Sequence, residues 1–222
     1  MSARRTTRIW ADDEGGYAAP LAAALLSLAT GVVVAAILLV LQPVARVKAL
    51  PKPAERGHGT VYLVEGNRDA GRLQTAPEKI QFLLRGQLVT FSEEDINALL
   101  EAAFAARAKK SSDGWATPGT PNVRIHEGVI QIAVEVKVEC LGQKMRVQLQ
   151  ARGTLRERAE GWFFEPAEVM LGALPLERIP FAAGWVTANF LDPRRLHPDL
   201  ATAWNRLGRV VVEGNLVKAA LR

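Results

Sequence analysis

Cysteine is almost absent from this sequence: Cys140 is the single one among 222 residues. This excludes an intramolecular disulfide and a cysteine-based zinc site as supports of the fold. Histidine is also scarce, and His58, His126 and His197 lack the close spacing of a metal-binding pair on a helix. We expect no metal ligands and place the histidines in solvated loops. Cys140 continues an apolar alternation, so we expect a small buried residue and not a nucleophile.

Motifs of nucleotide binding and catalysis are missing as well. The sequence contains no P-loop, no G-x-G-x-x-G and no G-x-S-x-G motif. The acidic cluster from Glu93 to Asp95 opens a predicted helix, where carboxylates stabilise the helix dipole without any catalytic role. We therefore predict no catalytic residues, no cofactor and no enzyme activity.

Charge of one sign is not concentrated anywhere after the N-terminal region. Lys and Arg number 28 and Asp and Glu 23, a formal net charge of +5, and the two signs are interleaved along the chain. A modestly basic, mixed surface favours solubility or weak attraction to anionic lipid. We expect no nucleic-acid partner.

What the sequence does have is one long apolar run, from Ala18 to Leu41, without a charged residue. As a helix it reaches about 36 Å, which exceeds the ~30 Å hydrocarbon core of a bilayer. The alternative is a cleaved signal peptide, with Val47-Lys48-Ala49 as the cleavage site. Signal-peptide apolar regions are shorter, about 7–15 residues, so we favour an uncleaved single-pass signal anchor. The basic residues on the two sides are nearly balanced and do not decide the orientation.

A predicted amphipathic helix begins at Ser92. Ser92 suits the N-cap, and Asp95 stands at the position where a capping box closes. The apolar residues then recur at helical spacing, which defines one stripe made of Ile96, Leu99, Leu100, Ala103 and Phe104.

A long β-hairpin follows, because apolar and polar residues alternate from Ile130 to Cys140 and again from Met145 to Leu155. A two-residue turn with Gly142 in its first central position pairs Val138 with Val147 and Glu139 with Arg146. Further strands are expected at 60–64, 87–91 and 162–171, and a closing hairpin at 209–213 and 216–219. Strands this long must twist, and their apolar face needs a cover. The predicted fold class is α+β: a long, curved antiparallel sheet packed on the amphipathic helix.

Two small residues, Ala151 and Gly153, fall on the apolar face of the second long strand. They either allow the helix to approach closely or leave a slot for a hydrophobic ligand. The predicted ligand-binding residues share this face or the helix stripe: Leu99, Phe104, Val136, Leu149, Ala151 and Gly153. A cavity of about 300 Å³ or more at this place would favour binding, and a solidly packed core would favour a structural role.

This arrangement resembles the YpmS-like family of membrane-anchored bacterial envelope proteins. The resemblance is carried by the helix motif Phe91 to Leu100 and by Leu171-Gly-Ala-Leu-Pro-Leu176, both downstream of the anchor. More distantly, the order of elements is similar to tubular lipid-binding domains. The resemblance implies a domain outside the cytoplasm and the handling of lipid. A lipoprotein cysteine near the N-terminus is lacking, so the helix itself would be the anchor.

These inferences divide the chain into four parts: a cytoplasmic leader (1–17), a transmembrane helix (18–41), a stalk (42–59) and an extracytoplasmic α+β domain (60–222). Two functions compete. The domain binds a hydrophobic ligand such as lipid, or it is a non-catalytic structural or protein-interaction domain of the cell envelope. The expected partners are the membrane and either a lipid or another envelope protein.

Overall fold

The computed structural model describes residues 18–49, 51–108, 116–140, 142–159, 161–190 and 198–222. The chain divides into two compact units, with the boundary between Leu38 and Leu39. The larger unit, Leu39–Arg222, holds every strand of the described residues. Cys140 belongs to the end of a strand, and His197 lies outside the described residues.

Helix α1 runs from Ala18 to Leu41, as the apolar run predicts. Its segment Ala19–Leu41 is long and apolar enough to cross a membrane. Pro20 falls within the first turn, where its missing N–H leaves no helical hydrogen bond unmade. The coarse architecture is therefore α+β, with one N-terminal helix of membrane-spanning length and a large antiparallel sheet.

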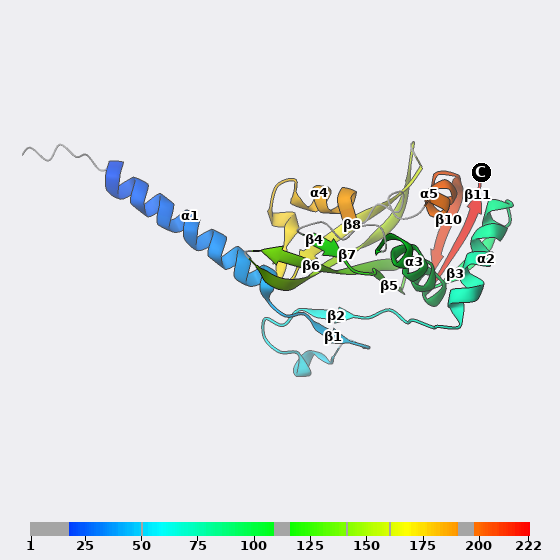
Figure 1. The fold of residues 1–222 in the computed structure, drawn as a ribbon, viewed down its shortest axis with the longest axis horizontal. Helices are drawn as coiled ribbons and strands as arrows, with labels where there is room; N and C mark the ends of the chain where they lie inside the picture. The colour runs from blue at the N-terminus through cyan, green and yellow to red at the C-terminus, as the bar shows by residue number, and fades with distance from the viewer. Residues whose placement is uncertain (1–17, 50, 109–115, 141, 160, 191–197) are drawn as a thin grey trace, which may run out of the picture. The chain divides into compact units, whose positions relative to one another are not determined.

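The large sheet is built around the predicted long hairpin (Figure 1). Its strands are β4 (Ala116–Pro118), β5 (Asn122–His126), β6 (Val129–Cys140), β7 (Gln143–Arg158), β8 (Gly161–Leu171) and β9 (Leu174–Pro175). The order is β4-β6-β7-β8-β9, and β5 also pairs with β6. All of these pairings are antiparallel.

The register of the hairpin differs from the prediction by two residues. Val138 pairs with Met145 and Glu139 with Lys144, so the predicted partners Val147 and Arg146 were wrong. Gly142 has φ +75° and occupies the second position of the turn, because Cys140 pairs with Gln143. A shift of two residues leaves every side chain on the same face, and the alternation alone cannot distinguish these registers.

A second sheet joins distant parts of the sequence in the order β10-β11-β3. It consists of β10 (Leu207–Glu213), β11 (Leu216–Leu221) and β3 (Val89–Ser92). The closing hairpin of β10 and β11 was predicted. The antiparallel pairing of β11 with β3 was not predicted. β3 ends at Ser92, directly before the helix that begins at Glu93.

A short parallel pair forms from β1 (Ala45–Val47) and β2 (Tyr62–Val64). β1 and the 3-10 helix η1 (Pro53–Glu55) lie in the segment predicted to be a stalk. Part of that segment is thus a strand of the larger compact unit.

The helices of the larger unit are α2 (Arg72–Leu84), α3 (Glu93–Ala108), η2 (Leu176–Arg178), α4 (Ala182–Phe190) and α5 (Pro198–Asn205). The predicted capping box of α3 is present: the Ser92 N–H donates to Asp95 Oδ2 at 2.9 Å, and the Asp95 N–H donates to Ser92 Oγ at 3.3 Å. Of the predicted stripe, Leu100, Ala103 and Phe104 are buried, and Ile96 and Leu99 are half-buried.

Candidate functional site

The strongest candidate site is an apolar cavity of about 210 Å³ between the two sheets and three helices. Figure 1 shows α2, α3 and α5 gathered with β3, β10 and β11 at one end of the large sheet. Helix residues in the wall are Ile80, Leu83, Ile96, Leu99, Leu100, Ala203 and Trp204. Strand residues in the wall include Phe91, Val123, Ile130, Ile132, Leu155, Phe164, Leu207, Val210, Val217 and Ala219.

The local sequence explains why so many apolar side chains point into one space. Ile80 and Leu83 are one helical turn apart on α2 and are both buried. Val217 and Ala219 alternate along β11 and share its buried face. The cavity therefore forms where apolar side chains of α2, of α3 and of the two sheets meet without filling the space between them.

The wall offers a ligand almost no polar group. Among the described residues of the wall, the Trp204 indole carries the only polar side-chain atom. Its Nε1–H donates to the Trp162 carbonyl at 2.8 Å, so it is already paired. A ligand in this cavity would have to be a hydrocarbon or the apolar part of a larger molecule.

Partly exposed wall residues mark where the cavity reaches the surface: Ile96, Leu99, Ile132, Leu155 and Trp204. They come from α3, β6, β7 and α5. A hydrocarbon chain that enters the cavity between these elements could extend partly out of it.

The cavity is partly open to solvent, so its apolar side chains contact water there when no ligand is bound. A hydrocarbon in the cavity would remove this apolar surface from water, which is favourable by about 25 cal/mol per Å².

Of the six residues predicted to bind a ligand, Leu99 lies in the cavity wall. Phe104, Val136, Leu149 and Ala151 are buried in packed core, and the cavity wall as described does not include them. The structure thus brings Leu99 to a cavity and leaves the other members in the packed interior.

Gly153 has a different reason for being small. A Cβ atom there would lie 2.1 Å from the Glu165 carbonyl oxygen and 2.7 Å from Pro166 Cα. The ladder between β7 and β8 shifts its register beside Gly153, which pairs with Pro166. The backbone of the neighbouring strand therefore fills the space that the sequence suggested for a helix or a ligand.

The wall also depends on a polar clamp that the sequence interpretation missed. Asn97 of α3 donates from Nδ2 to the Val123 carbonyl at 2.8 Å and accepts the Val123 N–H at 2.7 Å. Glu93, one turn earlier, accepts the Ile125 N–H at 2.8 Å. Two side chains spaced i, i+4 thus pair with the backbone of β5 and hold α3 against it. The acidic cluster was interpreted only through the helix dipole. The i, i+4 spacing of Glu93 and Asn97 places both on one face of α3 but does not identify the strand that they contact.

The buried carboxylate of Asp95 pairs at the same helix start with two partly exposed cations of α2. Lys79 Nζ lies 2.5 Å from Asp95 Oδ2, and Arg72 Nη1 lies 3.8 Å from Oδ1. Burial raises the pKa of Asp95, but hydrogen bonds from Lys79 and Ser92 and the Lys79 charge together lower that pKa below its ordinary value. The hydrogen bond from Ser92 is the main cause that lowers the pKa of Glu94. These contacts fasten α2 to α3.

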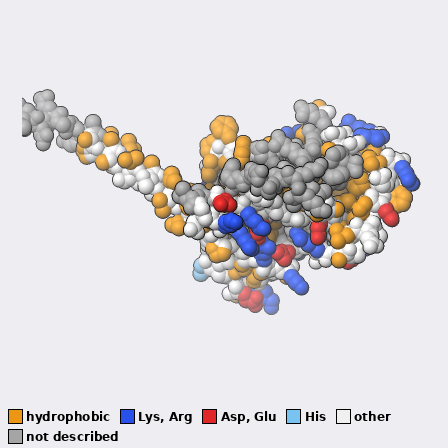
Figure 2. All heavy atoms as spheres, viewed as in Figure 1, with side chains coloured by type: hydrophobic (Ala, Val, Ile, Leu, Met, Phe, Trp, Pro, Cys, Tyr) orange, Lys and Arg blue, Asp and Glu red, His pale blue; other side chains and the backbone are white. Residues whose placement is uncertain are grey.

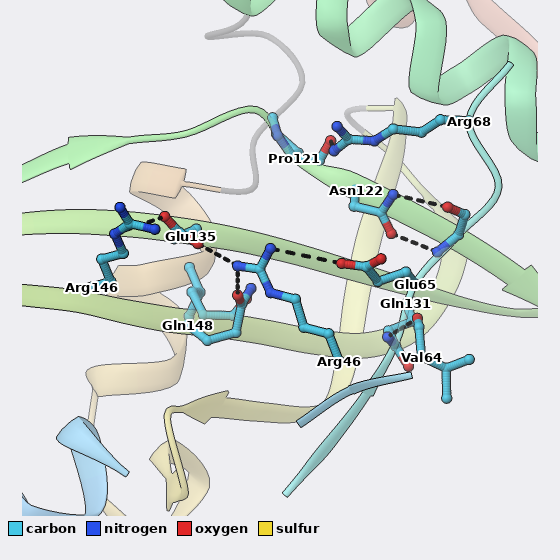
Figure 3. Close-up of polar contacts among 12 residues, drawn as sticks. Arg46, Val64, Glu65, Arg68, Pro121, Asn122, Gln131, Glu135, Arg146 and Gln148 are labelled. Atoms are coloured by element: carbon cyan, nitrogen blue, oxygen red, sulfur yellow. Dashed lines mark hydrogen bonds and ion pairs between the residues drawn. The ribbon is translucent and has the colours of Figure 1, made fainter. Parts of the chain in front are cut away.

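The opposite, polar face of the large sheet is linked to β1 and β2 (Figure 3). Arg46 of β1 pairs with Glu135 of β6, contacts Gln148 of β7 at 3.2 Å and lies 3.7 Å from Glu65. Gln131 donates to the Val64 carbonyl at 3.1 Å. Polar residues of the alternating hairpin therefore bind β1 and β2 within the larger unit.

A second hollow, of about 360 Å³, lies beside this contact and is lined by Arg56, Tyr62, Gln150, Arg152 and Glu168 among others. Arg152 already pairs with Glu168 at 3.6 Å and with Gln131 at 3.0 Å. Within the described residues, no group of three or more His, Cys, Asp or Glu side chains could hold a metal ion.

No protein-family model matches the chain, and no curated protein matches it significantly. The resemblance to the YpmS-like family rests on its two short motifs alone.

Proposed function

We propose that the protein is a single-pass membrane protein whose larger unit binds a hydrophobic ligand, such as the acyl chain of a lipid, in the cavity between α2, α3, α5 and the two sheets. The observation that carries the proposal is the apolar wall around about 210 Å³ of space.

The size of the cavity narrows the ligand. A cavity of about 150 Å³ lined by Leu, Ile and Phe holds benzene, whereas whole drug-sized ligands occupy about 300–1,000 Å³. The observed 210 Å³ suits a short hydrocarbon or the end of an acyl chain. The rest of a lipid would lie outside, past Leu99 and Leu155 at the partly exposed rim.

In this proposal α3 is the amphipathic cover of a curved sheet. Its stripe from Ile96 to Leu100 faces the ligand, and the clamp of Glu93 and Asn97 on β5 fixes the distance between helix and sheet. The clamp is rigid because its partners are backbone groups of a strand.

For sidedness, we propose that the N-terminus lies in the cytoplasm and the larger unit in the cell envelope. The support is the resemblance to envelope proteins together with the helix of membrane-spanning length. Alkaline phosphatase fused after Arg222 should be active, since it folds only outside the cytoplasm. A well-expressed but inactive fusion would reverse the orientation.

The alternative function is a non-catalytic structural or protein-interaction domain of the envelope. It is favoured by the burial of Leu149 and Ala151, which are each 1% exposed and line neither of the two hollows described above, although the sequence suggested a slot there. In that case the cavity between the sheets would be a packing defect without a ligand.

Native mass spectrometry of the full chain, released from detergent micelles, separates the two functions. Lipid should remain bound to the wild type and be lost from Ala203→Leu, which places a larger side chain in the wall. Ala151→Leu is the matched control, because it makes the same change at a buried position outside the cavity and should retain lipid. Equal lipid retention by wild type and Ala203→Leu, or none in either, would favour the structural alternative.

A further inference from the structure

Three large apolar side chains are exposed on the short segment that joins η2 to α4 and on the first turns of α4. Phe181 is 92% exposed, Trp185 56% and Ile179 40%. We call these three residues the α4 patch. In Figure 2, hydrophobic side chains gather on the surface where Figure 1 places the start of α4. A nearly fully exposed Phe in water is unusual enough to need a cause.

The backbone at this patch is also unusual. Phe181 has φ +65°, a left-handed conformation that is an outlier for a bulky residue. Such strain is concentrated at functional sites, where the surroundings hold it in place. Here it accompanies an aromatic side chain that is 92% exposed.

The same part of the chain is tied to the end of the apolar helix. The Ala173 N–H donates to the Leu39 carbonyl at 2.9 Å, and both residues belong to the larger unit. Gly172 has φ +59°, and a Cβ atom there would lie 2.3 Å from the Val40 carbonyl oxygen. A glycine is required for this approach, so the turn between β8 and β9 closes on the last turn of α1.

This contact fixes the depth of the turn relative to a bilayer. In the proposed crossing of the membrane by α1, Leu39–Leu41 ends the segment of membrane-spanning length and lies at the edge of the hydrocarbon layer. The turn at Ala173, which contacts these residues, would then lie at the membrane surface. Ile179 is the sixth residue after Ala173, so the two are at most about 20 Å apart even if the chain between them is fully extended.

We propose that the α4 patch inserts into the lipid interface as a second membrane contact in addition to α1. Trp and other aromatic side chains are enriched at this depth, because one part of the ring is buried in apolar surroundings and another remains near water. Exposed Arg178 precedes the patch, where it can pair with lipid phosphate. The inference rests on the proposed crossing of α1 and not on the cavity ligand.

The test uses the full chain in lipid nanodiscs, with Cys140 replaced by Ala and one new cysteine carrying an environment-sensitive fluorophore. Three sites are compared: Phe181→Cys in the patch, Leu28→Cys in α1, and Leu88→Cys as the control. Leu88 directly precedes β3 and is an apolar residue that is 67% exposed but belongs neither to α1 nor to the patch. We expect the labels at 28 and 181 to be quenched by spin-labelled lipid at least twofold more than the label at 88.

Quenching at 28 but not at 181 would overturn the patch and leave the anchor standing. No quenching at 28 would overturn the membrane crossing and the inference with it. A second measurement needs no label: Trp185→Phe in the otherwise unchanged chain should lose part of the tryptophan emission that brominated lipid quenches. Unchanged quenching in this variant would also contradict the proposal.

Discussion

The interior of the larger unit contains two apolar regions that look equivalent in sequence but differ in packing. Leu149 and Ala151 of β7 and Val169 of β8 are each 1% exposed and do not line the cavity described above. Between the two sheets, Leu99, Leu155 and Trp204 surround about 210 Å³ of space. We call these the packed region and the cavity region.

The difference shows that a small residue in a strand is a poor indicator of a binding slot. Gly153 is small because the backbone of β8 approaches it. The cavity instead arises where helices and a second sheet converge from distant parts of the chain. Its walls consist mostly of ordinary large aliphatic residues, which no local pattern sets apart.

The largest expected effect sharpens the description of the packed region. Val136→Asp should abolish folding of the full chain, since it places an unpaired carboxylate in the core beside β7. Lys137→Asp, on the exposed face one residue later, should fold normally. Circular dichroism and urea denaturation in detergent measure both, and equal stability of the two variants would refute the assignment of faces.

A somewhat smaller effect is expected at the clamp that holds the wall of the cavity region. Asn97→Ala removes the side-chain hydrogen bonds of Asn97 to the Val123 N–H and to the carbonyl groups of Val123 and Asn67. We expect a loss of about 3 kcal/mol, because each buried unpaired group costs about 1–3 kcal/mol and some will find water. Asn205→Ala, at an exposed position, is the control. If both variants have the same urea midpoint, the clamp does not support the fold.

The direct comparison of the two regions is a pair of identical substitutions. Ala151→Leu overpacks the packed region and should cost about 1–3 kcal/mol of stability. Ala203→Leu extends a side chain into the cavity region. It should change the free energy of unfolding of the ligand-free protein by less than about 1 kcal/mol, because the new apolar contacts in the cavity offset the local strain. Thermal denaturation of the two variants measures the difference, and a greater loss for Ala203→Leu would mean that the cavity is closed.

The smallest expected effect is in the pH dependence of stability. The pKa values of Glu94 and Asp95 are lower in the folded than in the unfolded chain. Near neutral pH these carboxylates therefore contribute stability, and the contribution is lost as the pH falls below about 4 and the unfolded chain binds more protons. Asp95→Asn should flatten this acid slope in urea denaturation series between pH 6 and pH 3. An unchanged slope would show that Asp95 does not titrate differently on folding.

The sequence predicted those features that depend on neighbours along the chain. The capping box of Ser92 and Asp95, the closing hairpin and the α1 boundaries follow from local propensity and spacing. The hairpin register was missed by two residues because both registers satisfy the same alternation. The pairing of β3 with β11 joins residues more than a hundred positions apart, so no local signal announces it.

The candidate site was predicted only in part for the same reason. Leu99 was identified because α3 has a clear stripe, whereas Trp204 and Val217 come from short elements whose placement is decided by tertiary packing. Asn97 was given no role in the sequence analysis, yet it is 1% exposed. Buried polar side chains that pair with a strand edge are visible only once the strand is placed.

The central claim is that an apolar ligand occupies the cavity region. Crystals of the full chain grown with a bromine-tagged fatty acid would locate the bromine directly by anomalous scattering. The account predicts a bromine peak within van der Waals contact of Leu99, Leu155 and Trp204, between α3 and the large sheet. A peak at Ala151 and Gly153, or a cavity closed by its own side chains with no bromine in it, would contradict the account.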